Sequence, residues 1–149
     1  MTTFIENRKA RFHYELGETL EAGIELLGFE VKSIKAGRGN FDGAYIVVRG
    51  KEVYLIGASI PPYQASNTPE DYDPARNRRL LLTKKEILRL QEIDKNKGLT
   101  LVPISLYNKG RLLKVSFSIA RGKRQTDKRQ SIKKREDDRE MERTLKKLR

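Results

Sequence analysis

Apolar and polar residues alternate strictly over Leu20–Leu26. A period of two predicts a strand with one buried face and with its carboxylates on the other face. Gly28 ends the alternation, and from Phe29 the apolar residues recur at helical spacing. We expect a short helix here that ends at Gly37, because glycine readily adopts the left-handed backbone that follows many helices. This stretch therefore predicts a half-buried strand followed directly by a short helix.

The same patterns predict further short strands and a second helix. A strand at Phe12–Leu16 is expected to turn at Gly17-Glu18 into the strand described above, and Ala58–Ile60 is expected to extend a later strand. Thr83 and Glu86 have the spacing of a capping box at a helix start. Strands at Tyr45–Val48 and Val53–Ile56 are expected to form a hairpin around Arg49-Gly50-Lys51, and strands at Thr100–Tyr107 and Leu112–Ala120 to pair across the turn Asn108-Lys109-Gly110. The second predicted helix is Lys84–Lys97, which buries Ile87, Leu88, Leu90 and Ile93.

These elements predict a mainly β fold. Roughly six or seven short strands leave long edges unless the sheet closes, so a small antiparallel barrel with helices at its ends is favoured over an open sheet. We expect an oligonucleotide-binding (OB)-like barrel with two or three helices and a basic C-terminal tail. The connection Tyr63–Asn77 is long for an idle link, which predicts a functional loop.

Charge narrows the class of partner. The 149 residues carry a net charge of +12 and include no cysteine, and the excess of cations predicts nucleic acid, ahead of an acidic membrane, as the partner. Residues 121–149 hold 13 Lys/Arg against 6 Asp/Glu, so we expect a globular domain at 1–122 and a separate tail at 123–149.

The chain lacks an apolar run of the ~20 residues that span a membrane and lacks a signal peptide, which predicts a cytoplasmic protein.

Cations gather at three places in the predicted globular domain, and we expect them to contact phosphates. On the first helix they recur every third residue and share a solvent-facing side, although a solvated face without function would look the same. The candidate phosphate-binding residues are Arg8, Lys9 and Arg11 near the N-terminus, Lys32, Lys35 and Arg38 on the first helix, and Arg76, Arg78 and Arg79 after the long loop.

The sequence contains few residues that could form a catalytic or metal site. The single histidine, His13, stands between aromatic residues, where packing or exposure is a better explanation than catalysis. A Gly-rich loop ending in Gly-Lys-Ser/Thr is missing, and Asp137-Asp138 lie among cations that explain them better than a metal does. We therefore expect no enzyme activity, no cofactor and no metal.

The tail offers little apolar surface. Met141, Leu145 and Leu148 have helical spacing, but like charges repel at several i, i+4 pairs. We expect the tail to be mostly disordered alone and helical when a polyanion neutralises the repulsion. A tail that only aids solubility is the alternative.

Four separated motifs resemble those of the SmpB family of SsrA-binding proteins, in the same order and over essentially the whole chain. They are Asn7-Arg8-Lys9-Ala10, Glu21-Ala22-Gly23-Ile24 with Gly28 to Ser33, Ser105-Leu106-Tyr107, and Gly122-Lys123 with Asp127-Lys128-Arg129. The resemblance implies a bacterial protein that binds transfer-messenger RNA (tmRNA) and delivers it to stalled ribosomes for trans-translation. It also implies a barrel that binds the tRNA-like domain, and a tail that enters the decoding centre and the empty mRNA channel as a helix.

The resemblance also assigns residues. The RNA-contacting positions of the family correspond to Asn7, Arg8, Lys9, Glu21 and Leu81, and its tail motif to Gly122, Asp127, Lys128 and Arg129. Thr126 stands where relatives often have histidine, so no imidazole role is carried over to that position. To the ribosome-binding tail we add the neighbouring cations Lys123, Arg124, Lys133, Lys134 and Arg135.

Two other classes of RNA-binding protein share this charge and layout. A ribosomal or ribosome-assembly protein would co-purify with ribosomal subunits, whereas a tmRNA partner would co-purify with one discrete small RNA. An RNA-processing nuclease would cleave RNA in the presence of a divalent metal.

Overall fold

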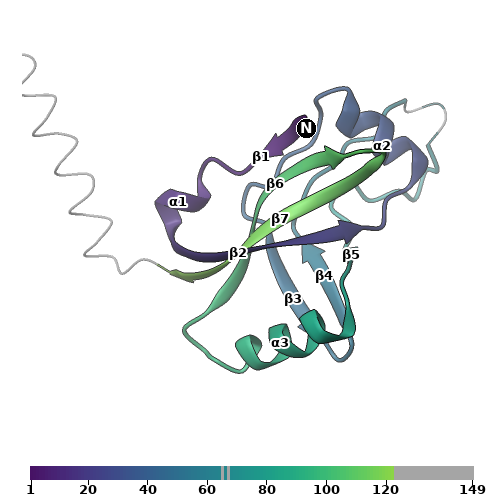
Figure 1. Cartoon of the computed structure of the whole chain (residues 1–149). Coiled ribbons are helices and arrows are strands. Elements are labelled where there is room, and N and C mark those ends of the chain that lie inside the picture. Colours follow the sequence, from purple (N-terminus) through teal and green to yellow (C-terminus); the bar gives the residue numbers. More distant parts are fainter. Residues whose placement is uncertain (65, 67, 123–149) are drawn as a thin grey trace, which may run out of the picture.

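The computed structural model describes residues 1–64, 66 and 68–122 (Figure 1). The predicted tail, with its candidate residues from Lys123 to Arg135, lies outside the described residues. In chain order the elements are β1 (Thr3–Glu6), α1 (Ala10–His13), β2 (Tyr14–Ile24), α2 (Gly28–Lys35), β3 (Tyr45–Arg49), β4 (Glu52–Ile56), β5 (Arg78–Leu81), α3 (Lys84–Asp94), β6 (Thr100–Lys109) and β7 (Leu112–Gly122).

The strands form one antiparallel sheet that closes on itself. Their order is β1-β6-β3-β4-β5-β2-β7, and β7 also pairs with β6. The strands from β6 round to β7 thus make a barrel, to which β1 adds an edge beside β6. The prediction of a small antiparallel, OB-like barrel is confirmed.

The barrel interior is filled by alternate residues of the strands and sealed by two helices. Val53, Leu55, Val115 and Phe117 are almost fully buried. Ile34 of α2 and Leu90 of α3 join the same cluster from opposite ends of the barrel (Figure 1). The helices therefore take the place of solvent at the two open ends of the sheet.

The start of the chain differs from the sequence prediction. Phe12 and His13 lie in the short helix α1, so the strand predicted at Phe12–Leu16 is confirmed only from Tyr14. β2 continues through Gly17 while it pairs with β7, so the predicted turn at Gly17-Glu18 is wrong. A Cβ added at Gly17 would lie 2.9 Å from the carbonyl oxygen of Ile119. Glycine is therefore needed there because β7 approaches closely, and the pairing shifts at this point instead of turning back.

The strand and helix predicted from Leu20 to Gly37 agree closely with the structure. β2 ends at Ile24 and α2 begins at Gly28. Gly37 follows the helix with φ of +82°, a conformation that glycine adopts without the steric cost of a side chain. The hairpin of β3 and β4 and the hairpin of β6 and β7 are confirmed as well.

The remaining differences concern short or isolated segments. Ala58–Ile60 does not extend β4; Ser59 instead forms an isolated bridge with Asn40. The four-residue strands β1 and β5 were not predicted, because so few residues carry no clear period. The capping box of α3 is present, but the helix ends at Asp94, and Leu88 is 61% exposed where burial was predicted. Within the described residues, no helix has the length and apolar character to cross a bilayer.

Candidate nucleic-acid interface

Five neighbouring strands, β1, β6, β7, β2 and β5, present one outward face, which we call the outer face. Residues that alternate with the core positions Ala22, Leu80, Leu106 and Val115 must point away from the barrel interior. Cross-strand pairing places them in two adjacent rows. One row contains Glu6, Ser105, Ser116 and Glu21, and the other contains Tyr107, Lys114, Gly23 and Leu81.

Glu21 is the polar centre of the outer face. The Tyr107 hydroxyl donates a hydrogen bond to its Oε2, and the Lys109 Nζ donates to its Oε1 at 3.2 Å. The bond from Tyr107, aided by Lys109 and opposed by burial, lowers the pKa of Glu21. Burial, followed by the bond to Glu21, raises the pKa of Tyr107 to about 12. At neutral pH Glu21 is thus an ionised acceptor and Tyr107 a neutral donor.

A groove of about 260 Å³ adjoins this face, between the ends of β2 and β5, helix α2 and the turn from β6 to β7. Its exposed apolar side chains are Leu81 and Leu112. Its cations are Lys35, Arg111 and Lys114. Cations neutralise phosphates, and an apolar surface receives bases, so the groove has the two features that an RNA-binding surface needs.

The groove unites predicted and unpredicted residues. Lys35 and Leu81 were candidates from the sequence and lie on different elements of the same groove. Arg111 and Lys114 were not candidates. Lys114 sits at an alternate position of a predicted strand, so its outward direction was readable, but the sequence does not show that this strand lies beside β2.

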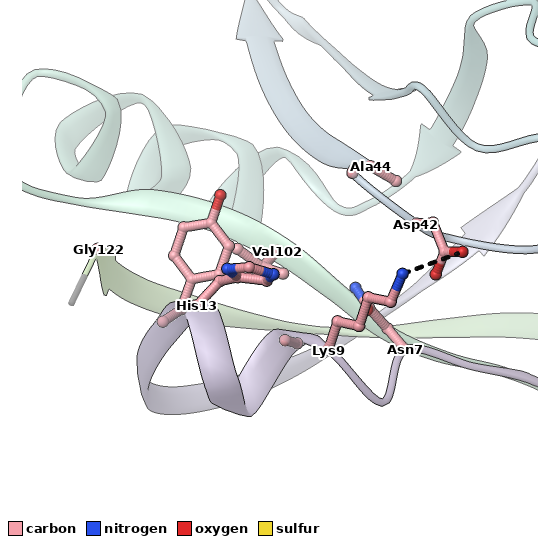
Figure 2. A pocket seen from close by; sticks show the side chains of 10 residues that line it. Asn7, Lys9, His13, Asp42, Ala44, Val102 and Gly122 are labelled. Carbon is pink, nitrogen blue, oxygen red and sulfur yellow. Dashed lines mark ion pairs between the residues drawn. The ribbon is translucent and has the colours of Figure 1, made fainter. Parts of the chain in front are cut away.

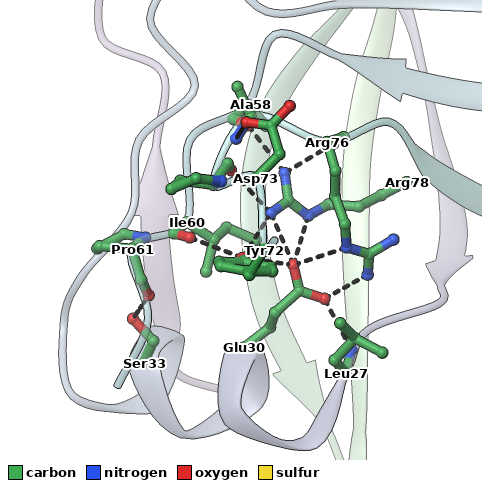
Figure 3. Close-up of polar contacts among 12 residues, drawn as sticks. Leu27, Glu30, Ser33, Ala58, Ile60, Pro61, Tyr72, Asp73, Arg76 and Arg78 are labelled. Atoms are coloured by element: carbon green, nitrogen blue, oxygen red, sulfur yellow. Dashed lines mark hydrogen bonds and ion pairs between the residues drawn. The ribbon is translucent and has the colours of Figure 1, made fainter. Parts of the chain in front are cut away.

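A buried ionic cluster holds α2 in place (Figure 3). Glu30 accepts hydrogen bonds from the Leu27 backbone N–H at 2.7 Å, the Tyr72 hydroxyl at 2.9 Å, and the Arg78 Nε at 2.9 Å and Nη2 at 2.6 Å. Arg76 also forms an ion pair with its carboxylate. Burial by itself raises the pKa of Glu30, but the bonds from Arg76, Leu27 and Arg78 outweigh it and lower the net pKa.

This cluster corrects one predicted contact. The side chain of Arg78 is 0% exposed, and it also donates to the carbonyls of Ala58 and Pro74, each at 2.9 Å. Arg78 therefore cannot reach a phosphate, and its assignment as an RNA-binding residue is wrong. This burial could not be expected from the local pattern, because arginine is seldom fully buried. Arg76 is 30% exposed, and a contact of its outer edge with RNA stays a prediction.

The long segment before β5 is also hydrogen-bonded to α2 and to the residues just after this helix. The Ser33 hydroxyl donates to the Pro61 carbonyl at 2.6 Å. Arg38, although exposed, donates to the carbonyls of Pro62 and Tyr63 at 3.4 and 3.3 Å. The loop thus braces the helix, and the outward side of α2 keeps Lys32 and Lys35 exposed.

The N-terminal candidates lie on the segment from β1 to α1. Asn7 is buried, and its Nδ2 donates to the Pro103 carbonyl at 2.8 Å, so its amide anchors the segment to β6. Arg8 is exposed and lies 4.0 Å from Glu6. Lys9 lies 3.9 Å from Asp42 at a pocket of about 520 Å³ (Figure 2).

That pocket lies at the end of the β2–β7 pair opposite the groove. It is lined by the exposed His13, by Tyr14 and by Gly122, the last described residue before the tail. Arg11, on α1, is exposed. Arg79 is exposed on β5, two residues from Leu81 and 3.9 Å from Glu25. The structure thus places Lys35 and Leu81 in one groove, Glu21 on the adjoining outer face, and α1 at the opposite end of the β2–β7 pair.

Known proteins resemble this chain along nearly its whole length. The family described as "SmpB protein" matches residues 4–147. Proteins named SsrA-binding protein from Gloeothece citriformis, Thermosynechococcus vestitus and Chloroflexus aggregans are each 50% identical to it over 141 residues, which is 95% of this chain and 91%, 93% and 89% of theirs. A solved structure from work on tmRNA–SmpB in the bacterial ribosome is 44% identical, with a TM-score of 0.68, and the match covers 85% of this chain and 92% of that one. With this fold and this extent of similarity, the chain belongs to the SmpB family.

Proposed function

We propose that this protein binds SsrA RNA, or tmRNA, and delivers it to stalled ribosomes for trans-translation. The observation that carries the proposal is the groove in which Lys35, Arg111 and Lys114 surround exposed leucines beside Glu21. The names of its relatives and the solved neighbour supply the identity of the RNA. The proposed place of action is the cytoplasm, where ribosomes translate.

The proposal divides the chain in two. Residues 1–122 bind the tRNA-like domain of the RNA, chiefly through the outer face and the groove. Residues 123–149 contact the ribosome in the decoding centre and the empty mRNA channel. The body residues that we assign to RNA are Arg8, Lys9, Arg11, Glu21, Lys32, Lys35, Arg38, Arg76, Arg79, Leu81, Arg111 and Lys114, with Asn7 as the anchor of the first three.

The direct test is to isolate the protein from a bacterial cell and sequence the RNA bound to it. We expect one discrete small RNA, the SsrA RNA, whose purified transcript also binds the purified protein. Ribosomal subunits at fixed stoichiometry, without that RNA, would instead identify a ribosomal or assembly protein. We propose binding without catalysis, so the bound RNA should remain intact when a divalent metal is added; cleavage would contradict this.

Lys35→Ala should weaken binding of SsrA RNA and reduce its salt dependence. Each phosphate contact contributes about 0.7–0.9 to the slope of log affinity against log salt concentration, so the slope should fall by about that amount. Binding measured at several salt concentrations gives the slope. Lys51→Ala, a matched change in the exposed turn between β3 and β4, should leave it unchanged. An equal slope for Lys35→Ala and the unchanged protein would remove Lys35 from the interface.

A further inference from the structure

We propose that Tyr72 is a positioning residue for RNA binding, because it holds helix α2 in the place from which Lys35 reaches the RNA. The inference rests on the proposed function and adds to it a residue that acts without touching the RNA. It follows from the hydrogen bonds of Tyr72, from the polar character of the buried side of α2, and from the place of Lys35 on the same helix.

Helix α2 needs support from outside itself. It is eight residues long, and isolated helices shorter than about 12–15 residues are marginally stable. Its buried side chains are those of Glu30, Ser33 and Ile34, of which only Ile34 is apolar. Hydrogen bonds fix a position more narrowly than apolar contacts do, since they require a particular distance and angle. The partners of Glu30 and Ser33 therefore decide where α2 lies.

Those partners lie in the connection between β4 and β5 (Figure 3). The Ser33 hydroxyl donates to the Pro61 carbonyl at 2.6 Å, and the carboxylate of Glu30 accepts from three side chains further along the same connection. We call residues 60–63 and 72–78, which include all these partners, the brace. The buried side of α2 is thus bonded to the brace at two positions, one on each of its successive turns.

Tyr72 joins α2 to both parts of the brace. Its hydroxyl oxygen lies 2.9 Å from the Oε2 of Glu30 and 2.8 Å from the Ile60 carbonyl oxygen. A hydroxyl has one proton, so these two acceptors share it. The same oxygen accepts a hydrogen bond from the Arg78 Nη2 at 3.1 Å. The hydroxyl thus connects the helix with the first and the second part of the brace at one point.

The ring and the hydroxyl of Tyr72 can be separated by mutation. The ring lies edge-on against Phe29 of α2, with the centroids 4.7 Å apart and the planes at 87°. Burial, followed by the bond to Glu30, raises the pKa of Tyr72, so the hydroxyl keeps its proton at neutral pH. Tyr72→Phe retains the ring contact and removes only the hydroxyl, which makes it the matched change for this inference.

Helix α2 carries the effect of the brace to the groove. Val31 and Lys35 both line the groove, and their spacing of four places them on one side of the helix, one turn apart. Because the helix is a single short rod, a shift of its buried side also moves Lys35. Lys114 lines the same groove from β7 and does not depend on the brace. Groups fixed before binding lose less conformational freedom when the ligand arrives, so the brace should raise the affinity for RNA through Lys35.

The first measurement is amide hydrogen exchange in the full-length protein without RNA. Tyr72→Phe should speed exchange in α2 by at least about tenfold, the usual effect of losing one hydrogen bond to a charged group, and leave β7 unchanged. Tyr54→Phe is the matched control, because its hydroxyl donates to Glu52 on β4, and it should leave α2 unchanged. Equal exchange of α2 in Tyr72→Phe and the unchanged protein would overturn the inference.

The second measurement separates positioning from a general loss of stability. Binding of an SsrA RNA transcript is compared for Tyr72→Phe alone and in combination with Lys35→Ala or Lys114→Ala. Changes that act through the same contact are not additive, whereas independent changes are. Tyr72→Phe should weaken binding by itself and with Lys114→Ala, and should cause little further loss with Lys35→Ala. The coupling with Lys35 should be at least about twofold in affinity.

An equal loss from Tyr72→Phe with and without the Lys35 side chain would overturn the positioning role. If Tyr72→Phe does not fold, Ser33→Ala removes the other bond between α2 and the brace, and the same coupling with Lys35→Ala then decides. Failure of the unchanged protein to bind the RNA at all would refute the proposed function itself, so the two failures are distinguishable.

Discussion

Glu30→Gln should destabilise the protein by about 3–5 kcal/mol, the usual cost of removing one member of a buried ionic cluster. The guanidinium of Arg78 is fully buried and its charge is balanced by Glu30, so the change leaves an uncompensated buried cation. A domain is typically stable by only about 5–15 kcal/mol. Urea denaturation should therefore show a large loss of unfolding free energy, with α2 and the loop that braces this helix affected first.

Glu25→Gln is the matched control. Glu25 forms an exposed ion pair with Arg79 at 3.9 Å, and such pairs contribute about 0–1 kcal/mol. A similar loss in both variants would show that the buried cluster contributes no more than a surface pair.

The loss in Glu30→Gln should also depend on pH. Because the folded pKa of Glu30 lies below its ordinary value, its contribution to stability is complete above the unfolded pKa of about 4.3 and declines as pH falls through the folded pKa. The difference between the unchanged protein and the variant should thus be full at pH 7 and shrink below about pH 4. A difference that grows on acidification would contradict the assigned charge state.

Deletion of residues 123–149 should abolish trans-translation while the body still binds SsrA RNA. These residues lie outside the described part of the structure, so the expectation rests on the sequence and on the family. They carry 12 Lys/Arg against 6 Asp/Glu, and their loss should reduce non-specific affinity for RNA. Peptide tagging on stalled ribosomes should fall to the level seen without the protein. Loss of RNA binding and tagging together would place the RNA contact in the tail.

A scrambled tail separates position from charge. Reordering residues 125–132 keeps every charge and disrupts Asp127-Lys128-Arg129. If these three residues make specific contacts with ribosomal RNA, the scrambled protein should bind SsrA RNA normally and fail to tag. Full tagging would mean that the tail acts only as a polycation.

Hydrophobic periodicity and capping residues within single segments predicted the strands and helices whose formation depends on local interactions. The alternation before Gly28 predicted the strand and the helix after it, and the spacing of Thr83 and Glu86 predicted the start of α3. Strand periods and turn glycines also predicted two hairpins, and hence a closed antiparallel barrel. The excess of cations and the four motifs pointed to the RNA-binding class and the family. Each of these rests on residues close together in sequence, where backbone geometry and neighbouring side chains set the outcome.

Other features depend on which distant segments come together. Gly17 looked like a turn residue, but the approach of Ile119 explains it. Arg78 looked like a phosphate contact, but Glu30, 48 residues earlier, takes its charge into the interior. Tyr107 lies 86 residues from Glu21 in the sequence. It reaches Glu21 only because β2 and β6 pair with opposite edges of the same strand, β7. Whether a charged side chain serves the core or the surface is decided by the partner that the closed barrel provides, and no local pattern records that partner.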